Sequence, residues 1–246
     1  MKKHNFLKNL ALSAVIILYV IYQYRFSLFG EKIDMPVAEM LKYNILGPMT
    51  QEETNMVMAL EGIAFMVYFH FIFGTYISRS FEHMPAYRFS RIGDRGRWFL
   101  GKCAELFVWT VVYVFFYLGS HLWAITRVTT ALVDEEVRAM FVILWIICVA
   151  LCYTFAILIN LFQIIWNKLI GFVVCYTGIL FCLVLPMATL NFALQFINPF
   201  TYMQILEERN GWLWAKLIYL GLLAIGAVVA GTIFVKKYDI SLKEVD

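Results

Sequence analysis

The chain has 246 residues, of which 62% are hydrophobic and 15% are charged, with a formal net charge of +3. A water-soluble globular domain carries about 25% charged residues, so this composition excludes an ordinary soluble enzyme or binding domain. The apolar runs are roughly 20 residues long. A helix of that length crosses about 30 Å of hydrocarbon, whereas barrel strands are only about 10 residues long, so the runs indicate membrane-spanning helices.

Six apolar runs predict six transmembrane helices. They cover roughly residues 9–28, 56–77, 103–125, 139–162, 169–190 and 212–234. The stretch 78–102 is predicted to be a cytoplasmic loop. The stretch 191–211 is apolar but interrupted by Pro199, so we predict an outer re-entrant segment there. The expected fold class is an all-α polytopic membrane protein, with residues 1–246 forming one transmembrane domain.

The distribution of positive charge predicts the orientation. Lys and Arg concentrate before the first run, in 78–102 and after the last run, while the intervening loops collect acidic residues. Positive charge is retained on the cytoplasmic side, so both termini are expected in the cytoplasm. The first run follows Lys2, Lys3 and Lys8 but ends without a small-residue cleavage site, which favours an uncleaved first span.

The five cysteines lie inside or at the edge of apolar runs. None forms a CxxC pair or stands at ligand spacing from a histidine, so no metal site is expected. We interpret them as small buried hydrophobic residues. They are Cys103, Cys148, Cys152, Cys175 and Cys182.

The predicted loop 78–102 is richer in charge than a simple connection needs. Residues 82–92 show apolar and basic positions at helical spacing, and Gly93 and Gly96 follow as expected helix terminators. We predict a short amphipathic helix that lies under the membrane and contacts a soluble partner. The expected contact residues are Glu82, Met84, Tyr87, Arg88, Phe89, Arg91 and Ile92. The alternative is a basic loop that binds anionic lipid headgroups.

Several elements follow one another in the order found in a known class of transporters. An acidic residue, a short helix, an Arg-rich turn, a Trp and a Gly-Lys pair lead into the third span, and an Asn-Pro element follows the fifth. The residues concerned are Glu82, Ser90, Arg91, Arg95, Arg97, Trp98, Gly101, Lys102, Asn198, Pro199 and Phe200. In these parts and in its six spans the chain resembles the permease subunits of type-2 ATP-binding-cassette exporters, of the small bacterial peptide-export or immunity kind.

This resemblance implies a set of partners. The short helix would be the coupling helix, which docks on a separate cytosolic ATPase subunit, so ATP and Mg are expected on that partner and no cofactor on this chain. A second permease copy, or a related permease, would complete the path across a bacterial plasma membrane. The implied activity is export of a hydrophobic or amphipathic substrate, such as an antimicrobial or toxin peptide. Neither catalysis by this chain nor nucleic-acid binding is expected.

Other functions were weighed against this interpretation. Residues 96–103 have the GxxxxGK spacing of a phosphate-binding loop, but Cys103 stands where Mg²⁺ needs a hydroxyl and no strand precedes the loop. The sequence also lacks a GxSxG elbow, an HExxH zinc pair and paired intramembrane aspartates. The alternative that stays open is a membrane scaffold or immunity protein that binds a partner or toxin without transport.

Two polar residues in the second predicted span are candidates for a substrate path. Ionisable groups inside a membrane are costly and therefore suggest function. Glu61 and His70 are nine residues apart, which places them on opposite faces of one helix, so they cannot form a single site. Glu61 is close enough to the outer end to reach the interface or to pair within the bundle. His70 is expected to form hydrogen bonds inside the bundle, with a transport role as the alternative.

Two polar residues of the third predicted span and four small residues of the last span have structural interpretations. Glu105 is expected to favour the start of the third span, since a carboxylate complements the helix dipole. His121 is expected at the outer membrane interface. In the last span, Gly226, Ala227, Ala230 and Gly231 form small-xxx-small pairs that permit close helix contact.

Overall fold

The computed structural model describes residues 3–24, 34–46, 56–82, 94–130, 133–184, 197–200 and 210–237. Every regular element in these ranges is a helix. They are α1 (Lys3–Ala14), α2 (Ile16–Gln23), α3 (Val37–Leu46), α4 (Met56–Phe73), α5 (Tyr76–Glu82), α7 (Arg95–Val128), α8 (Glu135–Ile165), α9 (Lys168–Val184), the 3₁₀ turn η4 (Asn210–Trp212) and α12 (Leu213–Lys237).

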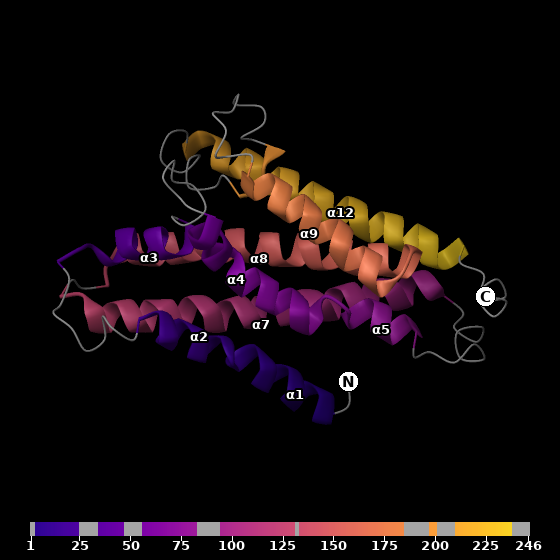
Figure 1. Ribbon diagram of the computed structural model, residues 1–246, viewed down its shortest axis with the longest axis horizontal. Coiled ribbons are helices and arrows are strands. Elements are labelled where there is room, and N and C mark those ends of the chain that lie inside the picture. Colours follow the sequence, from indigo (N-terminus) through magenta and orange to yellow (C-terminus); the bar gives the residue numbers. More distant parts are fainter. Residues whose placement is uncertain are drawn as a thin grey trace.

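The helices run alongside one another as an elongated bundle (Figure 1). The first residues of α1, the end of α5, the start of α7 and the end of α12 all lie toward one end of this bundle. At that end Gly96 of α7 lies against Lys236 and Thr232 of α12. Helices α1 and α7 therefore lead away from this end, whereas α5 and α12 lead toward it.

Within the described residues, four helical segments are long and apolar enough to cross a membrane. They are Phe6–Gln23, Arg95–Val128, Glu135–Ile165 and Leu213–Lys237. In the runs predicted at 56–77 and 169–190, the described residues form shorter helices: α4 and the start of α5 in the first run, and α9 in the second. Large apolar side chains face outward, such as Phe71 at 82% exposure. Over the described residues these features confirm an all-helical fold, and they are compatible with a helical membrane protein.

Side-chain caps set the starts of three helices. Asp94 accepts a hydrogen bond from the Arg97 N–H (3.1 Å), Asp134 accepts one from the Val137 N–H (2.9 Å), and Asn167 caps α9 in the same way. Each bond satisfies one of the backbone donors that a helix start leaves open.

The cap at Asp94 corrects two expectations. Helix α7 begins at Arg95, so Glu105 lies three turns inside it rather than at its start. Gly96 is likewise in the first turn of α7 instead of terminating a preceding helix. The sequence interpretation failed because it placed the helix start at the membrane boundary, whereas the helix extends beyond its apolar part. Of the predicted loop 78–102, residues 95–102 belong to α7 and 78–82 to α5.

The second predicted span is not one continuous helix. Helix α4 ends at Phe73, Gly74 and Thr75 form a turn, and α5 begins at Tyr76. The N–H of Gly74 still donates to the carbonyl oxygen of His70 (2.6 Å), so the chain keeps its general direction through the interruption. The break lies near the C-terminal end of the predicted span 56–77.

Helix α3 was not predicted from the sequence, which placed only a polar loop there. Its residues Val37, Leu41 and Ile45 recur every four positions and are fully buried against α7 and α8. The hydroxyl of Thr129, just after α7, donates to the carbonyl oxygen of Met35 (2.9 Å) and fixes the start of this helix. The apolar stripe is short and is surrounded by polar residues. The mean hydropathy of the segment therefore does not reveal it.

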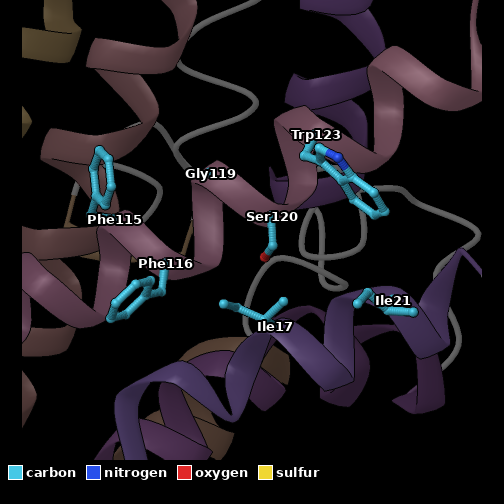
Figure 2. A pocket seen from close by; sticks show the side chains of 7 residues that line it. All are labelled: Ile17, Ile21, Phe115, Phe116, Gly119, Ser120 and Trp123. Atoms are coloured by element: carbon cyan, nitrogen blue, oxygen red, sulfur yellow. The ribbon is translucent and has the colours of Figure 1, made fainter. Parts of the chain in front are cut away.

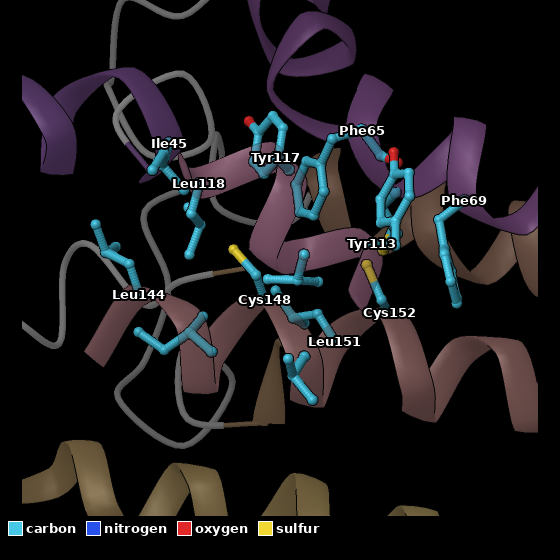
Figure 3. Packing of buried hydrophobic residues seen from close by; sticks show 14 of the residues in the cluster. Ile45, Phe65, Phe69, Tyr113, Tyr117, Leu118, Leu144, Cys148, Leu151 and Cys152 are labelled. Carbon is cyan, nitrogen blue, oxygen red and sulfur yellow. The ribbon is translucent and has the colours of Figure 1, made fainter. Parts of the chain in front are cut away.

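The core lies where α4, α7 and α8 meet (Figure 3). Phe65 and Tyr117 stack with ring centroids 4.5 Å apart, and the Tyr113 hydroxyl donates to the carbonyl oxygen of Phe65 (2.5 Å). Cys148 and Cys152 are buried beside them as small hydrophobic residues, as predicted. Lipid is as apolar as this core, so shape complementarity and hydrogen bonds hold the helices together more than the hydrophobic effect does.

Helix α12 packs on α7 through the small residues expected to permit close contact. A side chain added at Gly231 would meet the Phe99 ring of α7, and Ala227 one turn earlier is also buried. Gly226, in contrast, faces open space. The pair Ala227 and Gly231 therefore joins two helices of the same chain.

Candidate functional site

The break between α4 and α5 is bridged by one side chain from α8. The side-chain oxygen of Asn160 accepts hydrogen bonds from the N–H groups of Ile77 (2.8 Å) and Ser78 (3.1 Å). Its amide nitrogen donates to the carbonyl oxygens of Ala156 (2.8 Å) and Phe73 (3.4 Å). Asn160 thus serves both the end of α4 and the start of α5, where a helix break otherwise leaves backbone groups open.

His70 joins α4 to two other helices. Its side chain is fully buried, with Nε2 3.1 Å from the carbonyl oxygen of Cys152 and Nδ1 3.2 Å from the hydroxyl of Tyr176. A carbonyl oxygen can only accept, so Nε2 carries a proton, and in the neutral ring Nδ1 accepts from Tyr176. His70 therefore forms hydrogen bonds inside the bundle, as the sequence predicted.

A third polar contact lies beyond the break, toward the end of α8. The hydroxyl of Ser78 donates to Oε1 of Gln163 (2.5 Å), and both side chains are buried. The amide nitrogen Nε2 of Gln163 has no hydrogen-bond partner among the described residues. Gly171 of α9 approaches the backbone of Gln163 so closely that a side chain there would collide with it.

These contacts meet along one face of α8. Cys152, Ala156, Asn160 and Gln163 are spaced by three or four residues and therefore lie on one face. That face holds α4 and α5 through Asn160 and Gln163, and α9 through its close approach to Gly171. We call the side chains of His70, Ser78, Asn160, Gln163 and Tyr176 the polar stripe.

A second polar cluster joins α5 to α7. Oε2 of Glu105 accepts from the hydroxyl of Tyr76 (2.7 Å) and from Nζ of Lys102 (2.7 Å), and this ammonium group lies 5.7 Å from the centroid of the Tyr76 ring. The Phe81 and Trp98 rings add a contact at 6.1 Å between centroids. Glu105, expected to start a helix, instead holds two helices together. We call Tyr76, Lys102 and Glu105 the α5–α7 cluster.

The predicted soluble-partner contacts lie mostly outside the described residues. Glu82 is the last residue of α5, and its side chain is not described. Outside the described residues are Met84, Tyr87, Arg88, Phe89, Arg91 and Ile92. Glu61 lies in α4, but its side chain is also outside the described part, so its place in a substrate path stays a prediction.

The sequence interpretation missed several buried polar residues. Asn160, Tyr176 and Lys216 all stand inside or at the edge of predicted apolar spans, and Lys216 of α12 is fully buried. A polar or charged residue within an apolar run is itself a signal, because lipid offers it no partner. His121, expected at the interface, is instead buried, with Nδ1 3.0 Å from the hydroxyl of Tyr24.

The chemistry available to the polar stripe is hydrogen bonding. Within the described ranges, no group of three or more His, Cys, Asp or Glu side chains could hold a metal ion. The stripe contains a histidine, amides and hydroxyls around an interrupted helix. Such side chains can exchange one hydrogen-bond partner for another when the helices move. Interrupted helices are common at the binding sites of membrane transporters.

Comparisons with protein-family models, with curated proteins and with solved structures found no match to the chain.

Proposed function

We propose that this chain is the membrane-spanning permease subunit of an ATP-driven exporter. One observation carries the proposal: the helix that leads into the segment 83–93 is broken inside the bundle and held there by Asn160. A helix broken at this place can change its direction without unfolding, because the bridge satisfies the open backbone groups on both sides. A transporter needs such a movable element between the site where the ATPase subunit docks and the substrate path.

Contacts on both sides of the segment 83–93 support this role. Helix α5 precedes it and α7 follows it, and the α5–α7 cluster holds these two helices together. At its start, α7 also contacts α12 through Gly96 and Lys236. A force on the segment would thus reach α5, α7 and α12 together, and through α5 the polar stripe.

The remaining parts of the proposal follow the resemblance and the charge pattern. The chain crosses a bacterial plasma membrane six times, with both termini in the cytoplasm. The segment around Glu82 and Arg88 docks on a cytosolic ATPase subunit that binds ATP and Mg, and two permeases form one path. The substrate is a hydrophobic or amphipathic molecule such as an antimicrobial or toxin peptide.

The first test is purification of the tagged chain from its native membrane in mild detergent. We expect an ATP-binding-cassette ATPase subunit in stoichiometric amount, identified by mass spectrometry, and ATP turnover in the eluate. A chain that purifies without an ATPase in several mild detergents would contradict the proposal and favour a scaffold or immunity protein.

A second test separates coupling from assembly. Replacing Glu82 and Arg88 together by alanine should leave membrane insertion intact while ATP hydrolysis and transport become uncoupled. Tyr76→Phe, which removes the hydroxyl that reaches Glu105, should weaken coupling in the same direction. Tyr68→Phe removes a hydroxyl bonded to the Leu12 carbonyl oxygen (3.3 Å), away from the α5–α7 cluster, and is the matched control. Normal transport by the double variant would refute the coupling assignment.

A further inference from the structure

An open apolar groove runs between α2 and α7 (Figure 2). Its volume is about 390 Å³, and Ile17 and Ile21 point into it from α2. Gly119 of α7 leaves the middle of the groove open, since a side chain added there would meet nothing within 4 Å. Ser120, which also lines the groove, already donates its hydroxyl proton to the Tyr117 carbonyl oxygen (2.8 Å).

The groove, together with the next turn of α7, spans about one membrane leaflet. Phe115 and Phe116 line one end of it and Trp123 the other. At about 1.5 Å per residue, the helix rises about 12 Å from residue 115 to residue 123 and about 18 Å to residue 127. Half of a hydrocarbon core of about 30 Å is about 15 Å. Trp123 is half exposed, as is common for the aromatic residues that mark the level of the lipid headgroups.

A positive charge stands just beyond the Trp123 end. Arg127 is exposed, and its guanidinium carbon lies 5.9 Å from the centroid of the Trp123 ring, one turn before it. The guanidinium group therefore lies beside a ring that itself lines the groove. Guanidinium binds phosphate well because its N–H groups form paired, charge-assisted hydrogen bonds.

We propose that the groove between α2 and α7 binds one glycerophospholipid, with an acyl chain along Gly119 and the phosphate at Arg127. One such molecule supplies both an apolar chain of leaflet length and an anion at its end. A second copy of this chain would offer apolar helix surface but no phosphate. The inference concerns a lipid site on the membrane-facing surface and does not depend on the proposed transport function.

The test is native mass spectrometry of the full chain purified in mild detergent. The wild type should retain one phospholipid per chain, and Gly119→Leu, which fills the groove, should lose it. In titrations with added lipid, the wild type should prefer phosphatidylglycerol to the matching diacylglycerol, which lacks phosphate, by about tenfold. Arg127→Gln, at an exposed position, should fold normally and bind the two lipids about equally.

Gly221→Leu on α12 is the matched control, because Gly221 also faces open space but lies outside the groove. It should retain lipid like the wild type. Equal lipid retention by Gly119→Leu and Gly221→Leu would overturn the proposal, as would an unchanged preference in Arg127→Gln. If Gly119→Leu instead dissociates a dimer while keeping its lipid, the groove holds a second copy of the chain and the proposal is wrong.

Discussion

At the residue scale, buried hydrogen-bonding side chains are the distinctive feature of this apolar chain. Asn160 uses both its oxygen and its nitrogen across the α4–α5 break, and His70 uses both ring nitrogens. Inside lipid an unpaired polar group costs free energy because no water can replace the lost partner. These two side chains therefore specify which helix faces meet.

Removal of the Asn160 amide should destabilise the fold. Asn160→Ala leaves the N–H groups of Ile77 and Ser78 without their acceptor, so we expect a loss of about 1–2 kcal/mol in unfolding free energy. Thermal unfolding in detergent measures this loss. Asn44→Ala is the control, since its amide nitrogen donates to the Met40 carbonyl oxygen one turn earlier in its own helix. Equal effects of both substitutions would argue against the bridge.

The cap of α7 should respond to acid. The Arg97 N–H donates to the Asp94 carboxylate and, together with the charges of Lys236 and Arg97, lowers the pKa of Asp94 below its usual 3.8. Because the folded pKa is the lower one, the cap's contribution to stability is complete above pH 3.8. It is lost as the pH falls through the folded value.

The Arg97 amide resonance should follow this titration, with a midpoint below 3.8. Asp94→Asn retains an oxygen that accepts the hydrogen bond but cannot titrate in this range. Its Arg97 resonance should therefore stay constant over the same pH interval. A midpoint at or above 3.8 in the wild type would show that the carboxylate does not form the cap.

At the element scale, close approach at glycine sets the packing of the shorter helices. Gly74 at the α4–α5 break lies against the Phe172 ring of α9, and Gly171 of α9 lies against Gln163 of α8. A β-carbon at Gly171 would stand 2.8 Å from the backbone nitrogen of Gln163. Backbone atoms of a neighbouring helix cannot move aside as a flexible side chain can, so the contact requires glycine.

Gly171→Ala should therefore separate α8 from α9. We expect a destabilisation of about 1–3 kcal/mol, the usual range for an overpacked contact. Gly178→Ala on the same helix is the control, because Gly178 faces open space and alanine is the better helix former. The control should be neutral or slightly stabilising in thermal unfolding. A stable Gly171→Ala variant would mean that α8 and α9 are farther apart than described.

At the scale of the whole molecule, the start of α1 and the end of α12 lie at one end of the bundle (Figure 1). The end of α5 and the start of α7 lie at the same end, and the end of α7 and the start of α8 lie at the opposite end. With the charge pattern, this arrangement predicts which connections face the cytoplasm.

Topology reporters test that orientation. Alkaline phosphatase inserted after Thr130 should be active, because we expect the connection between α7 and α8 outside the cell. The same reporter fused after Lys237 should be inactive, whereas green fluorescent protein fused there should fluoresce. The reverse pattern would place both termini outside and remove the cytoplasmic docking site from the proposal.

The sequence alone predicted a helical protein with segments long enough to cross a membrane, because runs of apolar residues as long as 139–162 have no other stable arrangement in lipid. It also identified His70 as a hydrogen-bonding residue, since an ionisable group in such a run needs a partner. Helix caps such as Asp134 and Asn167 were readable in principle, because each is a local interaction three residues long.

Only the tertiary structure decided how these helices are divided and joined. The break at Gly74 and the bridge from Asn160 join residues more than 80 positions apart, and Glu105 finds Tyr76 of a different helix. Helix α3 likewise depends on the surfaces of α7 and α8 that bury it. Contacts between distant segments leave no periodic pattern in the sequence, because each helix is apolar when considered by itself. Which polar side chains meet depends on the surface of the neighbouring helix.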